Sequence, residues 1–213
     1  SSRDFGLRIT QIDGGNLRNA IAREAFAIVC VPANRSQHFE ELVTEFNSIA
    51  QAEFKVTEPD LKISFEIEMK HNFIIDKTTQ DNLINSLYAC PHGVMAWSAD
   101  IPNFVETSTN LASVKMSDNE ITIATSQRSS VESSKDDICN MVASVFTLAG
   151  ANVRHSDGYP GWKPNSNSII VEIARKAYVD LFNQEPQVKA IHAGLECGLI
   201  GHAYPKMDMI SYG

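Results

Sequence analysis

Positive charge is scarce in this sequence. Eighteen Lys and Arg residues stand against 26 Asp and Glu residues, which gives a formal net charge of -8. No stretch combines clustered Lys and Arg with interleaved aromatic residues. Since nucleic-acid-binding proteins hold phosphates with such basic clusters, we expect no nucleic acid among the partners of this protein.

Long apolar runs are also absent. The longest one falls well short of the roughly 20 residues that a membrane-spanning helix needs. The N-terminal stretch SSRDFGLRIT has no signal-peptide core and no initiator Met, so we interpret it as an internal starting point. We therefore expect a cytoplasmic protein without a membrane segment.

Cysteines are few and irregularly spaced, at Cys30, Cys90, Cys139 and Cys197. No CxxC pair and no HExxH helix motif is present, so neither a zinc knuckle nor a familiar helical metal pair is indicated. Reduced thiols in a cytosolic protein are the expected state of these residues.

What the sequence does contain is enough apolar residue, 43% of 213, to bury a core. Alternating apolar and polar residues predict strands, and apolar residues three and four apart predict helices. The predicted strands begin at Phe5 and then cover 24–32, 61–69, 94–99, 105–116, 120–130 and 151–156, and the predicted helices cover 39–54, 83–88, 138–146 and 169–181. A turn is predicted at Asp13–Gly15. This order predicts an α+β fold of two β-α-β units, with helices packed on one face of a mainly antiparallel sheet.

The composition changes at 156–168, where Gly, Pro, Ser and Asn crowd together, and we expect a domain boundary there. Residues 1–157 form one predicted domain, and residues 158–213 form part of another. The second part holds one helix and two predicted short strands, 187–193 and 207–213, which cannot enclose a core alone. We therefore expect its helix to expose apolar side chains around Ile170, Ile173 and Leu181.

The stretch KAIHAGLECGLIG places side chains capable of chemistry among glycines, which typically indicates the wall of a pocket. His192 and Cys197 form a nucleophilic pair only if they lie within hydrogen-bond reach, which their spacing does not establish. His192 and Glu196 are metal ligands by residue type alone. The remaining alternative is a turn before a short helix with Cys197 buried.

Two further polar residues are candidates for ligand binding. Arg128 shares a predicted strand face with Ser126, where its planar guanidinium offers a fork to a carboxylate, or is simply an exposed charge at a sheet edge. Asn19 follows a glycine turn, where its amide bonds either its own backbone or a ligand.

Several motifs together resemble the aminoacyl-histidine dipeptidases, also called cytosolic non-specific Xaa-His dipeptidases. They read, in order, DGGNLRNAIAREAFA, CPHGV, VETSTNLA, SQRSS, GYPGWKPN and AIHAGLECGLIGHAYPKMDMISYG. The resemblance extends from about Phe5 to the end of the chain. It implies that residues 1–157 are most of a lid and dimerisation domain, N-terminally incomplete, and that 158–213 begin the final catalytic segment.

The resemblance also implies a function. Members of this family are di-zinc metallopeptidases that act through a metal-bound hydroxide, commonly as homodimers, and their zinc ligands and catalytic carboxylates fall outside the matched region. The chain is therefore expected to lack both the zinc ligands and the catalytic residues, and to be inactive alone. What carries over is dipeptide binding by Asn19, Arg128 and Gly194. Independently of the resemblance, we expect Glu196 to pair with the α-amino group of the substrate, and we include His192 among the substrate-binding candidates.

Two alternatives to a dipeptidase remain open from the sequence. One is a non-catalytic dimerisation or binding module built on the lid fold. The other keeps the enzyme class but changes the reaction to that of a metallo-carboxypeptidase or a deacylase acting on N-acylated substrates.

Overall fold

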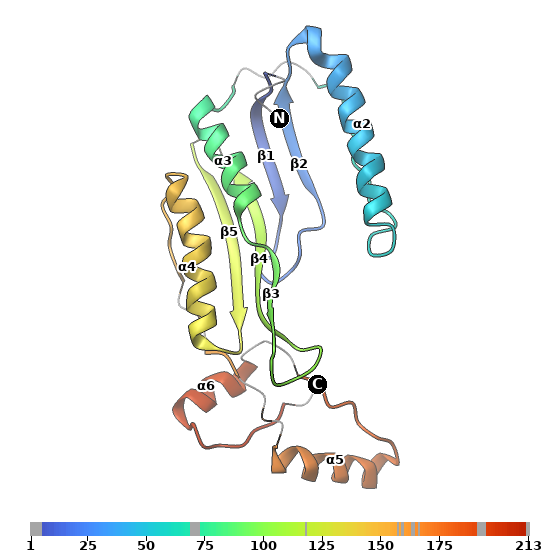
Figure 1. The fold of residues 1–213 in the computed structure, drawn as a ribbon, viewed down its shortest axis with the longest axis vertical. Helices are drawn as coiled ribbons and strands as arrows, with labels where there is room; N and C mark the ends of the chain where they lie inside the picture. The colour runs from blue at the N-terminus through green and yellow to red at the C-terminus, as the bar shows by residue number, and fades with distance from the viewer. Residues whose placement is uncertain are drawn as a thin grey trace. The chain divides into compact units, whose positions relative to one another are not determined.

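The computed structural model describes residues 6–68, 73–117, 119–156, 158, 160–162, 165, 167–190 and 195–211. Five strands form one sheet in the order β2-β1-β4-β3, with β5 paired to β4, and the β1–β2 and β3–β4 pairs are antiparallel. The strands are β1 (Arg8–Gly15), β2 (Ala25–Cys30), β3 (Gly93–Trp97), β4 (Val105–Met116) and β5 (Ile121–Ser129). The helices are η1 (Ala33–Arg35), α2 (Ser36–Glu53), α3 (Lys77–Ala89), α4 (Glu132–Leu148), α5 (Ile169–Phe182) and α6 (Leu195–Ala203). The predicted α+β class, with helices and a mainly antiparallel sheet, is confirmed (Figure 1).

Contacts divide the chain into two compact units. Unit 1 holds residues 1–14, 24–84 and 114–122, and unit 2 holds residues 15–23, 85–113 and 123–213. Strand β4 and strand β5 each contribute residues to both units, so the division does not follow the secondary structure.

In unit 1, the predicted helix over 39–54 is found as α2, but the predicted strand over 61–69 is wrong for its described residues. Residues 61–68 have no strand structure. Their backbone is bonded by side chains of α2 instead: Ile63 N–H donates to Asn47 Oδ1 at 2.6 Å, and Gln51 Nε2 donates to the Leu61 carbonyl at 2.9 Å. The alternating pattern therefore reflects a segment lying along a helix, where helix amides take the place of a neighbouring strand.

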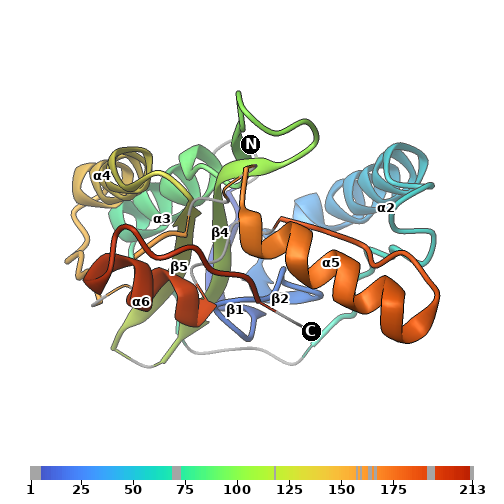
Figure 2. The same cartoon turned by 90° about the horizontal axis from the view of Figure 1, so that it is seen from below.

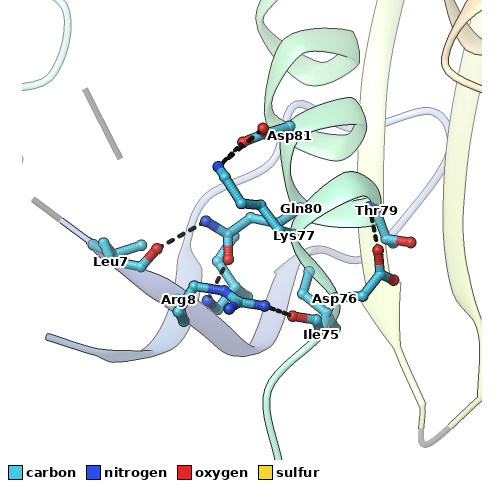
Figure 3. Close-up of polar contacts among 9 residues, drawn as sticks. Leu7, Arg8, Ile75, Asp76, Lys77, Thr79, Gln80 and Asp81 are labelled. Carbon is cyan, nitrogen blue, oxygen red and sulfur yellow. Dashed lines mark hydrogen bonds and ion pairs between the residues drawn. The ribbon is translucent and has the colours of Figure 1, made fainter. Parts of the chain in front are cut away.

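The start of β1 is joined to α3 by Gln80, whose side chain is only 2% exposed. Figure 3 shows its amide beside the backbone at the start of β1: Nε2 donates to the Leu7 carbonyl at 2.9 Å, and Oε1 accepts from Ile9 N–H at 2.8 Å. The Ile75 carbonyl accepts from the Arg8 guanidinium, and Ile75 N–H donates to the Ile9 carbonyl at 3.0 Å. Because the amide of Gln80 is bonded at both ends, its burial is not penalised.

In unit 2, helix α4 packs on β4 and β5. Ile138, Val142 and Phe146 are 2%, 5% and 7% exposed and form a core with Cys90. Leu111 of β4 and Ile123 of β5 pack against this core, and α4 lies along β5 in Figure 1. Burial raises the pKa of the Cys90 thiol, because the thiolate would lose its hydration. All four cysteines are free.

Hydrogen bonds between polar side chains under α4 show which side of β4 and β5 faces this helix. Thr107 and Ser129 share a hydrogen bond at 2.8 Å, and Gln127 Nε2 donates to Thr109 Oγ1 at 3.0 Å. Cys139 of α4 in turn contacts Gln127. Since side chains alternate along a strand, the odd-numbered residues of both strands face α4 and the even-numbered ones face the other side.

Beyond β5, the predicted helix over 169–181 is confirmed as α5, but three predicted strands are wrong. The described residues of 151–156, 187–193 and 207–213 have no strand structure, and 191–194, 212 and 213 lie outside the described residues. The described part of the last segment, 207–211, instead contributes a hydrogen-bond acceptor to the N-terminus of α5. Asp208 Oδ2 accepts from Ser168 Oγ, the N-cap, at 2.8 Å and from Ile170 N–H at 3.3 Å. The Ser168 hydrogen bond is the main cause that lowers the pKa of Asp208, since it favours the charged carboxylate.

Candidate functional site

Asn19 lies on the loop between β1 and β2. Ala20 N–H donates to the Leu17 carbonyl at 3.2 Å, which makes Asn19 the third residue of a four-residue turn. The Asn19 side chain is exposed and makes no hydrogen bond with any described residue. The turn is therefore closed by its backbone, and the amide of Asn19 is left for other partners.

Strand β4 holds this loop at two points. Gly15 has a φ of +65°, and a Cβ atom placed on it would lie 1.9 Å from the Ala112 carbonyl oxygen. Three and five residues after Gly15, the carbonyls of Arg18 and Ala20 accept hydrogen bonds from Asn110 Nδ2, at 3.1 and 2.8 Å. The turn that presents Asn19 is thus fixed against the even-numbered side of β4.

Arg128 lies on the same side of the sheet. The hydrogen-bonded pairs Thr107–Ser129 and Thr109–Gln127 indicate the register of β4 and β5, in which Arg128 lies opposite Ser108 and diagonal to Asn110. Diagonal neighbours across an antiparallel pair lie about 7 to 8 Å apart. The Arg128 side chain is half-buried, and within the described ranges its guanidinium has neither an ion pair nor a hydrogen bond.

The remaining predicted residues belong to the segment around α6. Glu196 lies in the first turn of α6 and is exposed, and Cys197 is 8% exposed, as the turn-and-helix alternative required. His192 and Gly194 lie outside the described residues. The nucleophilic pair and the metal pair that involve His192 therefore stay untested.

The loop 160–162 lies in space between the end of β5 and α6. A Cβ on Gly161 would lie 2.4 Å from the Ser129 carbonyl, and one on Gly198 would lie 2.5 Å from the Pro160 carbonyl. These close approaches bring α6 near the end of β5, and Figure 2 shows α6 at that end of the strand. A hollow of about 470 Å³ opens there, lined by Glu132, Trp162, Cys197, His202 and Lys206 among others.

Glu132, at the start of α4, supports the same loop. Its Oε1 accepts from Gly161 N–H at 2.7 Å, and its Oε2 pairs with Lys135 Nζ at 2.6 Å. The hydrogen bond from Lys135 is the main cause that lowers the pKa of Glu132, so this carboxylate stays charged at neutral pH.

Sequence reasoning missed both Glu132 and Asn110. Only the VETSTNLA motif pointed to Asn110, and it carried no role.

The described residues lack two features that would bear on function, a cluster of metal-binding side chains and a membrane-spanning helix. No three or more His, Cys, Asp or Glu side chains among them gather where they could hold a metal ion. The residues of this chain that the structure describes therefore do not fit a zinc centre. No helix among them has the length and apolar character to cross a membrane.

Comparisons with known proteins identify relatives of this chain. A family model described as a peptidase dimerisation domain matches residues 2–58. The cytosol non-specific dipeptidase of Escherichia coli (strain K12) is 38% identical over 212 residues, which cover 100% of this chain and 44% of that protein. The crystal structure of aminoacylhistidine dipeptidase from Vibrio alginolyticus matches with a TM-score of 0.87 and 36% identity, over 100% of this chain and 43% of that one.

The chain thus spans less than half the length of the relatives that it matches. Both matches cover 100% of this chain, one in sequence and one in structure. Both relatives belong to the family that the motifs predict. The family prediction is therefore confirmed: this chain is related over its whole length to part of the aminoacyl-histidine dipeptidases.

Proposed function

We propose that this chain is the lid and substrate-binding part of a dipeptidase that hydrolyses Xaa-His and other unblocked dipeptides. The observations that support the proposal are the hydrogen bonds that indicate Arg128 and the Asn19 turn on one side of β4 and β5. The guanidinium of Arg128 is half-buried and has no partner among the described residues, and the amide of Asn19 has free hydrogen-bonding groups. On the same side of the sheet, these two groups suit a ligand that carries a carboxylate and a peptide carbonyl.

Each residue has a role in this proposal. Arg128 binds the free C-terminal carboxylate of the dipeptide through paired N–H groups. Asn19 donates to the scissile carbonyl, where negative charge develops during hydrolysis. Gly194 would allow the backbone to approach the substrate, Glu196 would receive the α-amino group, and His192 is proposed as a further substrate-binding residue.

The proposal assigns the metal chemistry to other residues. Two zinc ions would supply activated water in the enzyme, and we propose that their ligands lie outside these 213 residues. Residues 1–157 would be the lid domain and 158–213 part of the catalytic domain. The exposure of α5 supports this division, since Ile170, Ile173 and Leu181 are 38%, 63% and 77% exposed, as expected for a helix that lacks its packing partner.

We further propose that the protein is cytoplasmic and forms a homodimer through unit 1. The segment matched by the dimerisation model contains β2, which ends the sheet, and α2, which exposes an apolar face. On that face Leu42, Phe46 and Ile49 are 42%, 56% and 52% exposed. An unpaired strand edge beside an apolar helix is a surface that a second copy can cover.

The dimer proposal predicts that Phe46→Glu yields a monomer, because a charge on the apolar face would be desolvated at the interface. Sedimentation velocity of the 213-residue chain over rising concentration measures this. Leu148→Glu is the matched control, since Leu148 is 88% exposed but lies at the end of α4 in unit 2. Equal masses for the two variants would contradict the proposed surface.

The dipeptidase proposal predicts hydrolysis of an unblocked Xaa-His dipeptide by the product of the complete gene with added zinc, and no hydrolysis by the 213-residue chain. The reason is that the described residues bring no metal ligands together. N-acylated amino acids serve as the comparison substrate, and a chelator tests the need for metal. Turnover by the chain itself would place metal ligands inside it, and turnover of acylated substrates alone would replace the dipeptidase with a deacylase.

A further inference from the structure

Asn110 of β4 uses its amide in an unusual way. Both hydrogen bonds from Nδ2 go to carbonyls of the same turn, those of Arg18 and Ala20, at 3.1 and 2.8 Å. These two carbonyls flank Asn19 on either side. Because carbonyl oxygens only accept, the NH2 end of the amide must face them, and this fixes the orientation of the Asn110 side chain.

The oxygen end of the Asn110 amide indicates that the hydrogen bonds to the turn, and not those of the oxygen, explain the position of this side chain. Asn110 Oδ1 is buried, and no described residue donates a hydrogen bond to it. A buried acceptor without a donor is destabilising, so the side chain does not occupy this position for its oxygen. What the position provides is a two-point attachment of the turn to a rigid strand.

The loop that carries Asn19 has few other contacts that could hold it in place. Residues 16–24 have exposed side chains, so no apolar packing holds the loop in place. Gly15 fixes the start of the loop against Ala112, and Asn110 fixes its middle. Without Asn110, the turn would be closed only by the bond from Ala20 N–H to the Leu17 carbonyl.

We infer that Asn110 is a positioning residue that holds Asn19 at the substrate carbonyl. The inference rests on the proposed dipeptidase function. Asn110 touches the turn but not the substrate, so its effect on hydrolysis passes through Asn19. A positioning error of about 1 Å costs on the order of 100-fold in rate, so a two-point attachment matters even where it adds little stability.

The test is a double-substitution cycle in the product of the complete gene, assayed on an Xaa-His dipeptide. Asn19→Ala is expected to lower kcat about 100-fold or more, and Asn110→Ala about 10- to 100-fold, with little change in KM. Asn110→Ala in the Asn19→Ala background is expected to cause no further loss, since the group that it positions is already gone. Asn110→Ser keeps one donor and should retain more activity than Asn110→Ala.

Thr109→Val is the matched control. It removes one side-chain hydrogen bond from the next residue of β4, on the opposite side of the sheet, and should leave kcat unchanged. Hydrogen exchange on the 213-residue chain adds a readout without catalysis: the Ala20 amide should exchange faster in Asn110→Ala than in Thr109→Val. Additive losses in the cycle, or equal losses in the control, would overturn the inference while the dipeptidase proposal stands. An Asn19→Ala enzyme with full activity would overturn the inference and the role of Asn19, whereas no hydrolysis by the unsubstituted enzyme would overturn the dipeptidase proposal.

Discussion

Gly15→Ala is expected to lower the free energy of unfolding of the 213-residue chain by about 3 to 5 kcal/mol. Two costs add at this position. The added methyl would lie 1.9 Å from the Ala112 carbonyl oxygen, and the φ of +65° is strained for any residue with a Cβ. Since the contact is with backbone, no side chain can rotate away, and β4 or the loop must shift. Urea denaturation followed by circular dichroism measures the loss.

Gly150→Ala separates these two costs. Gly150, beyond the end of α4, has a φ of +79° but no atom within 4 Å of an added Cβ. Only the conformational strain applies there, and the expected loss is about 1 kcal/mol. If the two variants lost the same free energy of unfolding, the close approach between Gly15 and β4 would be refuted.

Arg128→Ala in the product of the complete gene is expected to raise KM for an unblocked dipeptide, with kcat little changed. Loss of a charged hydrogen bond to the substrate carboxylate should cost about 2 to 3 kcal/mol, or about 30- to 150-fold in kcat/KM. The effect should vanish for a dipeptide with an amidated C-terminus, since that substrate has no carboxylate to bind. Steady-state kinetics on both substrates provide the comparison.

Two variants serve as controls for this result. Arg128→Lys keeps the charge but loses the planar fork, and should fall between the native enzyme and Arg128→Ala. Arg154→Ala removes an exposed arginine from the same unit and should change neither constant. Unchanged kinetics in Arg128→Ala would remove Arg128 from the substrate site.

The sequence predicted most elements because local pattern and tertiary packing agree in them. Helix α4 shows this: the residues that recur at helical spacing, Ile138, Val142 and Phe146, are the ones buried. The prediction of a strand over 61–69 was wrong because alternation of apolar and polar residues does not distinguish a segment paired with a strand from a segment lying along a helix. There Asn47 and Gln51 satisfy the backbone that a neighbouring strand would otherwise bond.

The candidate site was predicted only in part. The identity of Asn19 and Arg128 came from motifs, but their placement on one side of the sheet depends on the register of β4 and β5, which comes from contacts 18 to 22 residues apart in the sequence. Asn110 carried no signal of its own, because an amide in the middle of a strand resembles any polar surface residue. The position of Glu132 beside Gly161 likewise depends on a contact across 29 residues.

The alternation along β4 has a consequence for how this protein can change. Its odd positions pack against α4, while its even positions hold the loop that carries Asn19. Substitutions can therefore alter the core and the loop independently of each other. Gaining or losing one residue within the strand would exchange the two sides, so that Leu111 faced the loop and Asn110 faced the core. The length of β4 is for this reason far less free to vary than its composition.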